Sequence, residues 1–127
     1  MPVRSINAET APAPAGPYSQ AVETSGTTRR LYISGQIPVA RDGSLPASFT
    51  AQARQAWANV EAQLAAAEMT LAHLVKVTVF LSDRAHTLEN REVRQEVLGD
   101  HAPALTVIIA GIFDEAWQLE IEAIAEA

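Results

Sequence analysis

The segment from Val75 to Leu81 alternates its side chains along a β-branched run, which is the pattern of a half-buried β-strand. One face would carry the apolar set Val75, Val77, Val79 and Leu81. The other face would carry Lys76, Thr78 and Phe80. Helical patterns stand on both sides of this strand in the sequence, so the chain has to cross over a sheet instead of folding as a series of hairpins.

Two amphipathic helices are predicted around this strand. The first begins near Ser48, whose hydroxyl can cap it, and its apolar positions recur every three or four residues: Ala53, Ala56, Trp57, Val60, Leu64 and Ala67. Its other side would carry polar residues that lie mostly outward: Gln52, Arg54, Gln55, Asn59 and Gln63. The second helix would run from about residue 85 to the glycine at 99, with Leu88, Val93 and Val97 as its apolar positions.

The remaining strands are expected at residues 21–24, 31–34, 106–110 and 118–124, and a further short strand could lie near residues 3–6. The first two would form a β-hairpin around the polar turn at 25–28. Residues 7–16 would be extended, and Gly16-Pro17-Tyr18 would form a fixed turn that presents Tyr18. The chain is therefore predicted to be a single α+β domain, residues 1–127, with a mixed sheet of about six strands and both helices on one face.

The sheet face away from the helices would be half polar, because Lys76 and Thr78 share it with Glu120 and Glu122 of the last strand. Such a face suits contact with another protein better than an apolar core, so we expect oligomerisation through the sheet. Glu120 and Glu122 share this face because they lie two residues apart. They could act as paired carboxylates, or they could be solvated surface residues.

Composition and charge oppose several classes of function. The chain has 9 lysines and arginines against 15 aspartates and glutamates, a net charge of −6, and Lys76 is its one lysine, which opposes nucleic-acid binding. It has no cysteine, and its three histidines, His73, His86 and His101, match no zinc spacing, so no metal is expected. No apolar stretch reaches the roughly 18 residues of a membrane span, so we expect a soluble cytoplasmic protein without membrane contact.

Several segments together resemble one protein family. The two N-terminal signatures are Gly16-Pro17-Tyr18-Ser19-Gln20-Ala21 and Leu31-Tyr32-Ile33-Ser34-Gly35-Gln36-Ile37-Pro38. Further matching segments are residues 52–60, 75–83 and 119–125. They follow one another in the right order over nearly the whole chain, and they resemble the reactive intermediate deaminase family, which is also called RidA or YjgF and was formerly called endoribonuclease L-PSP.

The resemblance implies a chorismate-mutase-like α+β subunit and a homotrimer that binds small molecules in three clefts between subunits. Archetypal members hydrolyse reactive enamines and imines, such as 2-aminoacrylate, to 2-oxo acids and ammonia, and they need no cofactor. The resemblance gives catalytic roles to Tyr18 and to Glu120, which would hold the attacking water. It places Ser34, Gly35 and Asn90 at the substrate.

One position departs from the family pattern. Archetypal members have an arginine after Pro-Ala that binds the substrate carboxylate through its guanidinium fork. Here Leu105 follows Pro103-Ala104. Leu105 and Val107, together with Ile109, would give a more apolar cleft floor that suits a less anionic ligand and predicts poor hydrolysis of 2-aminoacrylate.

Two functions follow as alternatives. The first is an enamine or imine deaminase whose substrate preference is altered, and the second is a non-catalytic, ligand-binding or regulatory homotrimer that uses the same cleft. Arg91 or Arg94 of the second helix could supply the missing positive charge, which the sequence leaves open. The acidic net charge and the single lysine speak against the older label of ribonuclease.

Overall fold

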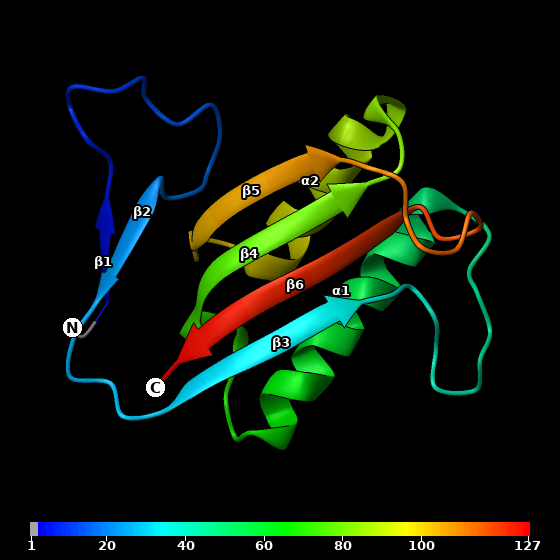
Figure 1. Ribbon diagram of the computed structural model, residues 1–127, viewed down its shortest axis with the longest axis horizontal. Helices are drawn as coiled ribbons and strands as arrows, with labels where there is room; N and C mark the ends of the chain where they lie inside the picture. Colours follow the sequence, from blue (N-terminus) through cyan, green and yellow to red (C-terminus); the bar gives the residue numbers. More distant parts are fainter. Residues whose placement is uncertain (1–2) are drawn as a thin grey trace.

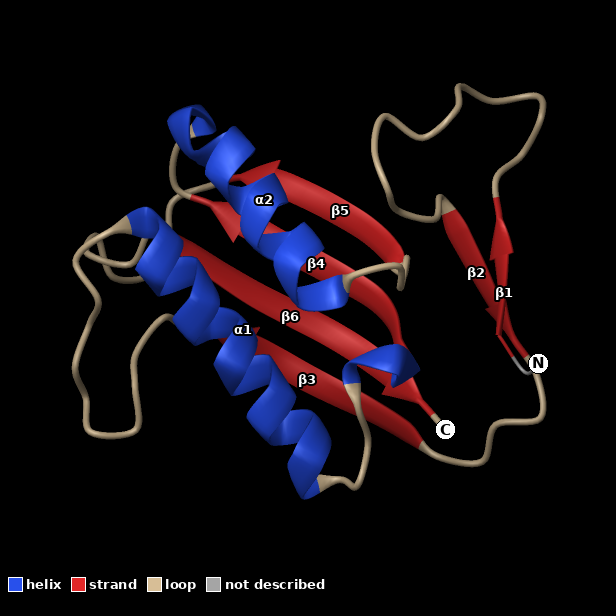
Figure 2. Cartoon of the chain, turned by 180° about the vertical axis from the view of Figure 1, so that it is seen from behind, coloured by secondary structure: helices blue, strands red, loops and turns tan. Residues whose placement is uncertain are grey.

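The computed structural model describes residues 3–127, which form an α+β fold (Figure 1). In chain order the elements are β1 (Val3–Ile6), β2 (Ala21–Thr24), β3 (Arg30–Gln36), α1 (Phe49–Ala66), β4 (Leu74–Leu81), α2 (Thr87–Leu98), β5 (Ala104–Ile109) and β6 (Leu119–Glu126). Four strands form a sheet in the order β3-β6-β4-β5, in which β4 and β5 are parallel and the other neighbours antiparallel. Both helices cover the same face of this sheet, as the sequence predicts (Figure 2).

The apolar stripe of α1 is buried against this sheet as predicted. Ser48 caps the helix by accepting a hydrogen bond from the backbone N–H of Ala51 at 3.2 Å. The stripe packs against the helix-facing side chains of the strands in one core, whose members include Trp57, Leu64, Val77, Val79, Leu81, Leu119 and Ile121. Burial of these large apolar side chains is the main term that stabilises the sheet–helix arrangement.

Gln52 differs from the expectation that it would lie outward. It is only 2% exposed, because it lies on the same side of α1 as the buried stripe. Its Nε2 donates to the carbonyls of Pro46 and Ala116 at 3.0 and 3.2 Å, and its Oε1 accepts from the N–H of Gln118 at 2.8 Å. A buried amide is stable here because all of these bonds satisfy it, and it joins two loops to the helix.

The predicted β-hairpin of residues 21–24 and 31–34 is wrong. β2 pairs with β1, and β3 pairs with β6, so the six strands divide into the four-stranded sheet and a separate β1–β2 ribbon beside it (Figure 1). The segment between β2 and β3 is instead tied to the C-terminal end of β6. The N–H groups of Thr28 and Arg29 both donate to the carbonyl of Ala127 at 2.9 Å, and the Thr27 hydroxyl donates to Glu126 at 2.6 Å.

The second helix buries Val93 and packs Val97 against the core as predicted, but the prediction for Leu88 is wrong. Leu88 is 65% exposed, whereas Asn90, Val93 and Arg94 are buried. At about 100° per residue, Leu88 points away from the side that carries Val93, so the two cannot both face the core. The helix ends as expected at Gly99, whose φ of +56° lies in the region that favours glycine.

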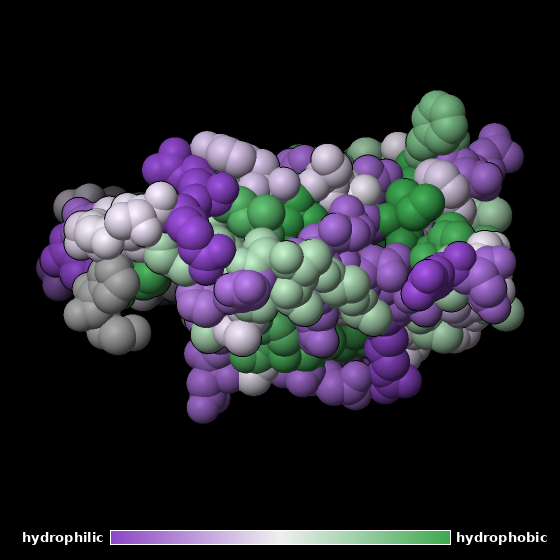
Figure 3. Space-filling view, turned by 90° about the horizontal axis from the view of Figure 1, so that it is seen from below, coloured by the Kyte–Doolittle hydropathy of each residue, from purple (hydrophilic) through white to green (hydrophobic). Residues whose placement is uncertain are grey.

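The face of the sheet away from the helices is called the open face below. It carries Tyr32 and Ser34 of β3, Lys76, Thr78 and Phe80 of β4, and Glu120, Glu122 and Ile124 of β6. Seen from below, at right angles to the view of Figure 1, the molecule shows apolar patches separated by hydrophilic side chains (Figure 3). Among residues 3–127, no helix combines the length and apolar character that a bilayer crossing requires.

Candidate functional site

A pocket of about 230 Å³ lies between α2, β5 and the segment that precedes β2, and it is called the α2–β5 pocket below. Its lining residues are Ala15, Gly16, Tyr18, Thr87, Asn90, Arg91, Arg94, Leu105 and Val107. Four of these, Tyr18, Asn90, Leu105 and Val107, are residues that the sequence analysis selected. The structure therefore brings together four of the seven predicted site residues from three parts of the chain.

Tyr18 reaches this pocket because the turn before it is tied to the start of β5. The N–H of Tyr18 donates to the carbonyl of Gly16 at 2.9 Å, which closes the tight turn predicted around Pro17. The next residue, Ser19, donates through its N–H to the carbonyl of Pro103 at 3.2 Å and through its hydroxyl to the carbonyl of Ala102. The half-buried phenol of Tyr18 is thus held beside the strand that carries Leu105.

α2 contributes the polar side chains of the pocket. Thr87, Asn90, Arg91 and Arg94 recur at three- and four-residue spacing, so they share one side of the helix. Asn90 is 2% exposed and its Oδ1 has no hydrogen-bond partner among the described residues. Burial lowers the pKa of the Arg94 guanidinium and the nearby charge of Arg91 lowers it further, although the guanidinium remains a cation at neutral pH.

β5 supplies the apolar part of the lining. Leu105 and Val107 pair in register with Val77 and Val79 of β4, so they point to the helix-covered face of the sheet. Leu105 is half-buried and packs against the core, whereas Val107 is more exposed at the sheet edge. Ile109 lies farther along the strand and is not part of the pocket lining, contrary to the expectation for the cleft floor.

The other predicted residues, Ser34, Gly35 and Glu120, lie together on the open face. A register shift between Ile33 and Gln36 places one extra residue of β3 opposite β6, which is the geometry of a β-bulge. The Glu120 side chain lies across the backbone of Gly35. A Cβ atom at Gly35 would come within 2.7 Å of Cδ and 2.9 Å of Cγ of Glu120, so this position requires glycine as long as Glu120 keeps its conformation.

The predicted residues therefore form two groups on opposite faces of the same sheet. The pocket group consists of Tyr18, Asn90, Leu105 and Val107, and the bulge group consists of Ser34, Gly35 and Glu120. The sheet itself separates them within one chain. A ligand could touch both groups only if a second copy of the chain contributed one of them.

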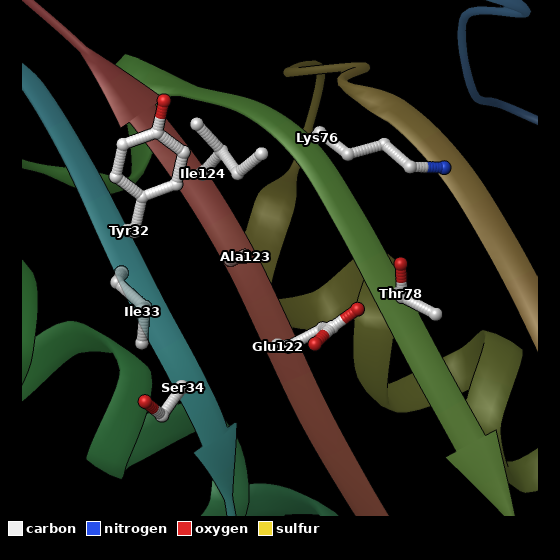
Figure 4. A pocket seen from close by; sticks show the side chains of 8 residues that line it. All are labelled: Tyr32, Ile33, Ser34, Lys76, Thr78, Glu122, Ala123 and Ile124. Atoms are coloured by element: carbon white, nitrogen blue, oxygen red, sulfur yellow. The ribbon is translucent and has the colours of Figure 1, made fainter.

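A hollow of about 370 Å³ lies on the open face and was not predicted from the sequence (Figure 4). It is lined by residues of β3, β4 and β6: Tyr32, Ile33, Ser34, Lys76, Thr78, Glu122, Ala123 and Ile124. In Figure 4 the carboxylate of Glu122 points toward Thr78, and the ring of Tyr32 lies beside Ile124. The strand alternation that predicted a half-polar face was the signal for these residues, since most of them are its outward members.

The structure contains no cluster that suits a metal ion within residues 3–127, where no three histidine, aspartate or glutamate side chains come together for one. The polar groups of the α2–β5 pocket are instead a phenol, an amide, a hydroxyl and two guanidinium groups. Guanidinium and amide groups donate hydrogen bonds and match carboxylates and similar anions. The pocket is therefore suited to an anionic or polar organic ligand.

Comparisons with known proteins identify the family. The sequence profile of the endoribonuclease L-PSP family matches residues 8–127. The chain belongs to this family. It is 35% identical over 126 residues to the 2-iminobutanoate/2-iminopropanoate deaminase of Escherichia coli, with 96% of each chain covered. The resemblance drawn from the sequence motifs is thereby confirmed.

Solved structures of family members share the fold of this chain. The crystal structure of YyfB from Yersinia pestis, a Rid-family protein of unknown function, superimposes with a TM-score of 0.85 at 27% identity and covers 100% of both chains. The structure of E. coli TdcF with bound serine gives a TM-score of 0.73 at 34% identity, with 98% of both chains covered. These similarities confirm the predicted chorismate-mutase-like α+β fold.

Proposed function

We propose that the chain is an enamine/imine deaminase that adds water to a C=N bond and releases ammonia and a carbonyl compound. Family membership and the similarity to an E. coli imine deaminase support this proposal. The observation that carries it is the position of Glu120, a carboxylate that lies across the bulge at Gly35. Glu120 is the residue to which the family resemblance gives the role of holding the attacking water.

The chemistry needs one base and one acid. Water attacks the imine carbon and forms a C–O bond, while Glu120 accepts a proton from that water and the imine nitrogen is protonated. The resulting carbinolamine then loses ammonia, since its C–N bond breaks as the C=O bond forms. An enamine first gains a proton on carbon and loses one from nitrogen, which converts it to the imine tautomer. The phenol of Tyr18 lines the pocket and would assist protonation of the nitrogen.

The proposed active unit is a homotrimer with a cleft between neighbouring subunits. In this arrangement the α2–β5 pocket of one subunit faces the bulge group of the next, which reconciles the two groups that one sheet holds apart. The half-polar open face and the exposed apolar side chains of β5, Val107, Ile108 and Ile109, support association through this region. Light scattering of the purified protein would give three times the subunit mass.

The test compares Glu120→Gln with Glu122→Gln. Both residues lie on β6 and face the same side of the sheet, and both changes remove one negative charge without altering shape. With freshly generated 2-iminobutanoate, Glu120→Gln should lower kcat by about 100-fold or more, which is the usual contribution of a general base. Glu122→Gln should stay within about threefold of the wild type. Equal rates for the two variants would refute the role of Glu120.

The second candidate is a ligand-binding or regulatory homotrimer without turnover, and Leu105 favours it. This residue stands where archetypal members have their carboxylate-binding arginine. Under this alternative, a compound that stabilises the protein would be recovered unchanged after long incubation. The wild type would not hydrolyse 2-aminoacrylate, whereas Leu105→Arg would gain that activity.

The charge of the chain opposes a nucleolytic function, despite the family name. Its net charge is −6, and Lys76 is its one lysine. Nucleic-acid binding rests on clustered cations that neutralise several phosphates. We therefore propose a small-molecule substrate rather than RNA.

A further inference from the structure

Arg94 is buried, and its guanidinium has no partner among the residues that the structure describes. Arg94 is 5% exposed, and its guanidinium takes part in none of the ion pairs or side-chain hydrogen bonds among residues 3–127. By contrast, three exposed arginines, Arg4, Arg30 and Arg54, each lie within 3.5 Å of a carboxylate. Burial of an uncompensated charge is unfavourable, so Arg94 is a residue that stability alone does not explain.

The three acidic residues of α2 do not compensate this charge. Glu89 accepts a hydrogen bond from the Thr50 hydroxyl at 2.7 Å, and Glu96 forms a bidentate pair with Arg54 at 2.9 and 3.0 Å, so both carboxylates are directed toward α1. The third, Glu92, is exposed and takes part in none of the ion pairs among residues 3–127. The pocket side of α2 is left with cationic and neutral polar groups only.

Asn90 adds a second unused polar group beside Arg94. The two residues are four apart on α2, so their side chains are neighbours on the helix surface. The Oδ1 of Asn90 is buried without a partner, and the amide lines the same pocket. Two buried polar side chains that lack partners and line one pocket indicate a ligand that would satisfy both.

The rest of the lining restricts the size and polarity of this ligand. Leu105 and Val107 form an apolar wall, and the volume of about 230 Å³ is below the range of drug-sized sites. A planar guanidinium matches the two oxygens of a carboxylate. A small monocarboxylate with a short apolar chain therefore fits both parts of the pocket.

We propose that Arg94, assisted by Asn90, is the carboxylate-binding residue of this chain and replaces the arginine that archetypal family members have where Leu105 stands. The inference rests on the proposed function in that the same α2–β5 pocket would hold the 2-imino acid substrate. The sequence analysis expected Leu105 to favour a less anionic ligand. If Arg94 binds the carboxylate, the chain recognises acids even though it lacks the arginine on β5. The cation comes from the helix side of the pocket, and Leu105 supplies the surface for the substrate side chain.

Binding of a stable product analogue tests the proposal without requiring turnover. The probe is 2-oxobutanoate, and its neutral counterpart is the methyl ester of the same acid; affinities are measured by calorimetry at low salt. The wild type should bind the acid at least about tenfold more tightly than the ester. Arg94→Met should weaken acid binding by about 10- to 100-fold, the range of a charge-assisted hydrogen bond, and should change ester binding by less than about threefold.

Two further variants protect this test against a folding defect. Arg94→Lys retains the charge but lacks the fork, so it should keep part of the preference for the acid. Arg41→Gln removes the same charge from an exposed loop position and should leave both affinities unchanged. Equal binding of acid and ester by the wild type would overturn the proposal. So would an acid preference that survives Arg94→Met, or one that is removed by Arg91→Gln instead.

Failure of this inference and failure of the proposed function give different results. If the wild type binds the acid through Arg94 but hydrolyses no imine, the assignment of Arg94 stands and the deaminase proposal fails. If the wild type hydrolyses 2-iminobutanoate while Arg94→Met retains its preference for the acid, the deaminase proposal stands and the assignment of Arg94 fails. If Arg94→Met changes only the subunit assembly and keeps the preference for the acid, Arg94 has a structural role and the proposal is overturned.

Discussion

Replacement of Gly35 by alanine should displace Glu120 while leaving the fold intact. The new Cβ atom would lie 2.7 Å from Cδ and 2.9 Å from Cγ of Glu120, distances that real Cβ atoms do not show. Glu120 is a flexible side chain, so it can rotate away, whereas the backbone of the bulge cannot move without breaking the β3–β6 pairing. The substitution therefore acts on the position of the carboxylate.

The cost in stability should be small. A side chain forced off its preferred rotamer costs roughly 0.5–1.5 kcal/mol. Gly35 is not in the positive-φ region, so alanine fits the backbone and restricts the unfolded chain, which stabilises by roughly 0.4–1 kcal/mol. The two effects oppose each other, and the free energy of unfolding in urea should change by less than about 1 kcal/mol.

The cost in activity should be large, because the general base is displaced. We expect kcat for 2-iminobutanoate to fall by about 100-fold or more, as in Glu120→Gln. Gly111→Ala is the control, since a Cβ atom there would meet nothing within 4 Å. In a Glu120→Ala background the steric conflict is absent. Gly35→Ala should therefore change the free energy of unfolding more favourably there than it does in the wild type. Retention of kcat within threefold, or a stability loss above about 2 kcal/mol, would refute this reasoning.

Two further predictions concern stability. Gln52→Leu should lower the free energy of unfolding by about 2–4 kcal/mol in a urea titration, because three hydrogen bonds are lost and buried backbone groups are left unpaired; a loss below about 0.5 kcal/mol would contradict the role of this amide. The hydroxyl of Thr27, followed by that of Thr24 and the charge of Arg30, lowers the pKa of Glu126 from its ordinary value of 4.5, so its stabilising effect is present above that value and is lost as the pH falls below it. The wild type should therefore be more stable than Glu126→Gln at pH 7, and this difference should vanish in acid; a difference that does not depend on pH would show that the carboxylate charge is irrelevant.

The sequence was sufficient to predict the elements whose pattern is local. The alternation from Val75 to Leu81 gives the central strand, and the apolar stripe that begins after Ser48 gives the long helix with its cap. Both patterns depend on residues a few positions apart, and burial of one face selects a single solution. The resemblance to the family then gave the candidate site residues, which the physical pattern alone does not distinguish from surface positions.

The sequence was not sufficient where the deciding partner is distant in the chain. The segment after β2 binds the end of β6, about a hundred residues later, and this excludes the expected hairpin. Gln52 reads as a surface residue because its partners are backbone groups of two loops. The sequence left Arg91 and Arg94 open as substitutes for the family arginine, and only the burial of Arg94 in the structure distinguishes it from the exposed Arg91.

Mixing two variants that are damaged in different halves of the proposed site tests the intersubunit cleft most directly. Tyr18→Phe damages the α2–β5 pocket, and Glu120→Gln damages the bulge group on the opposite face of the sheet. After refolding an equal mixture, about one quarter of the clefts (½ × ½) would combine an intact pocket from one subunit with an intact bulge group from its neighbour. Hydrolysis of 2-iminobutanoate should recover to about that fraction of the wild-type rate. A mixed oligomer with no more activity than its two parents would contradict the two-subunit site.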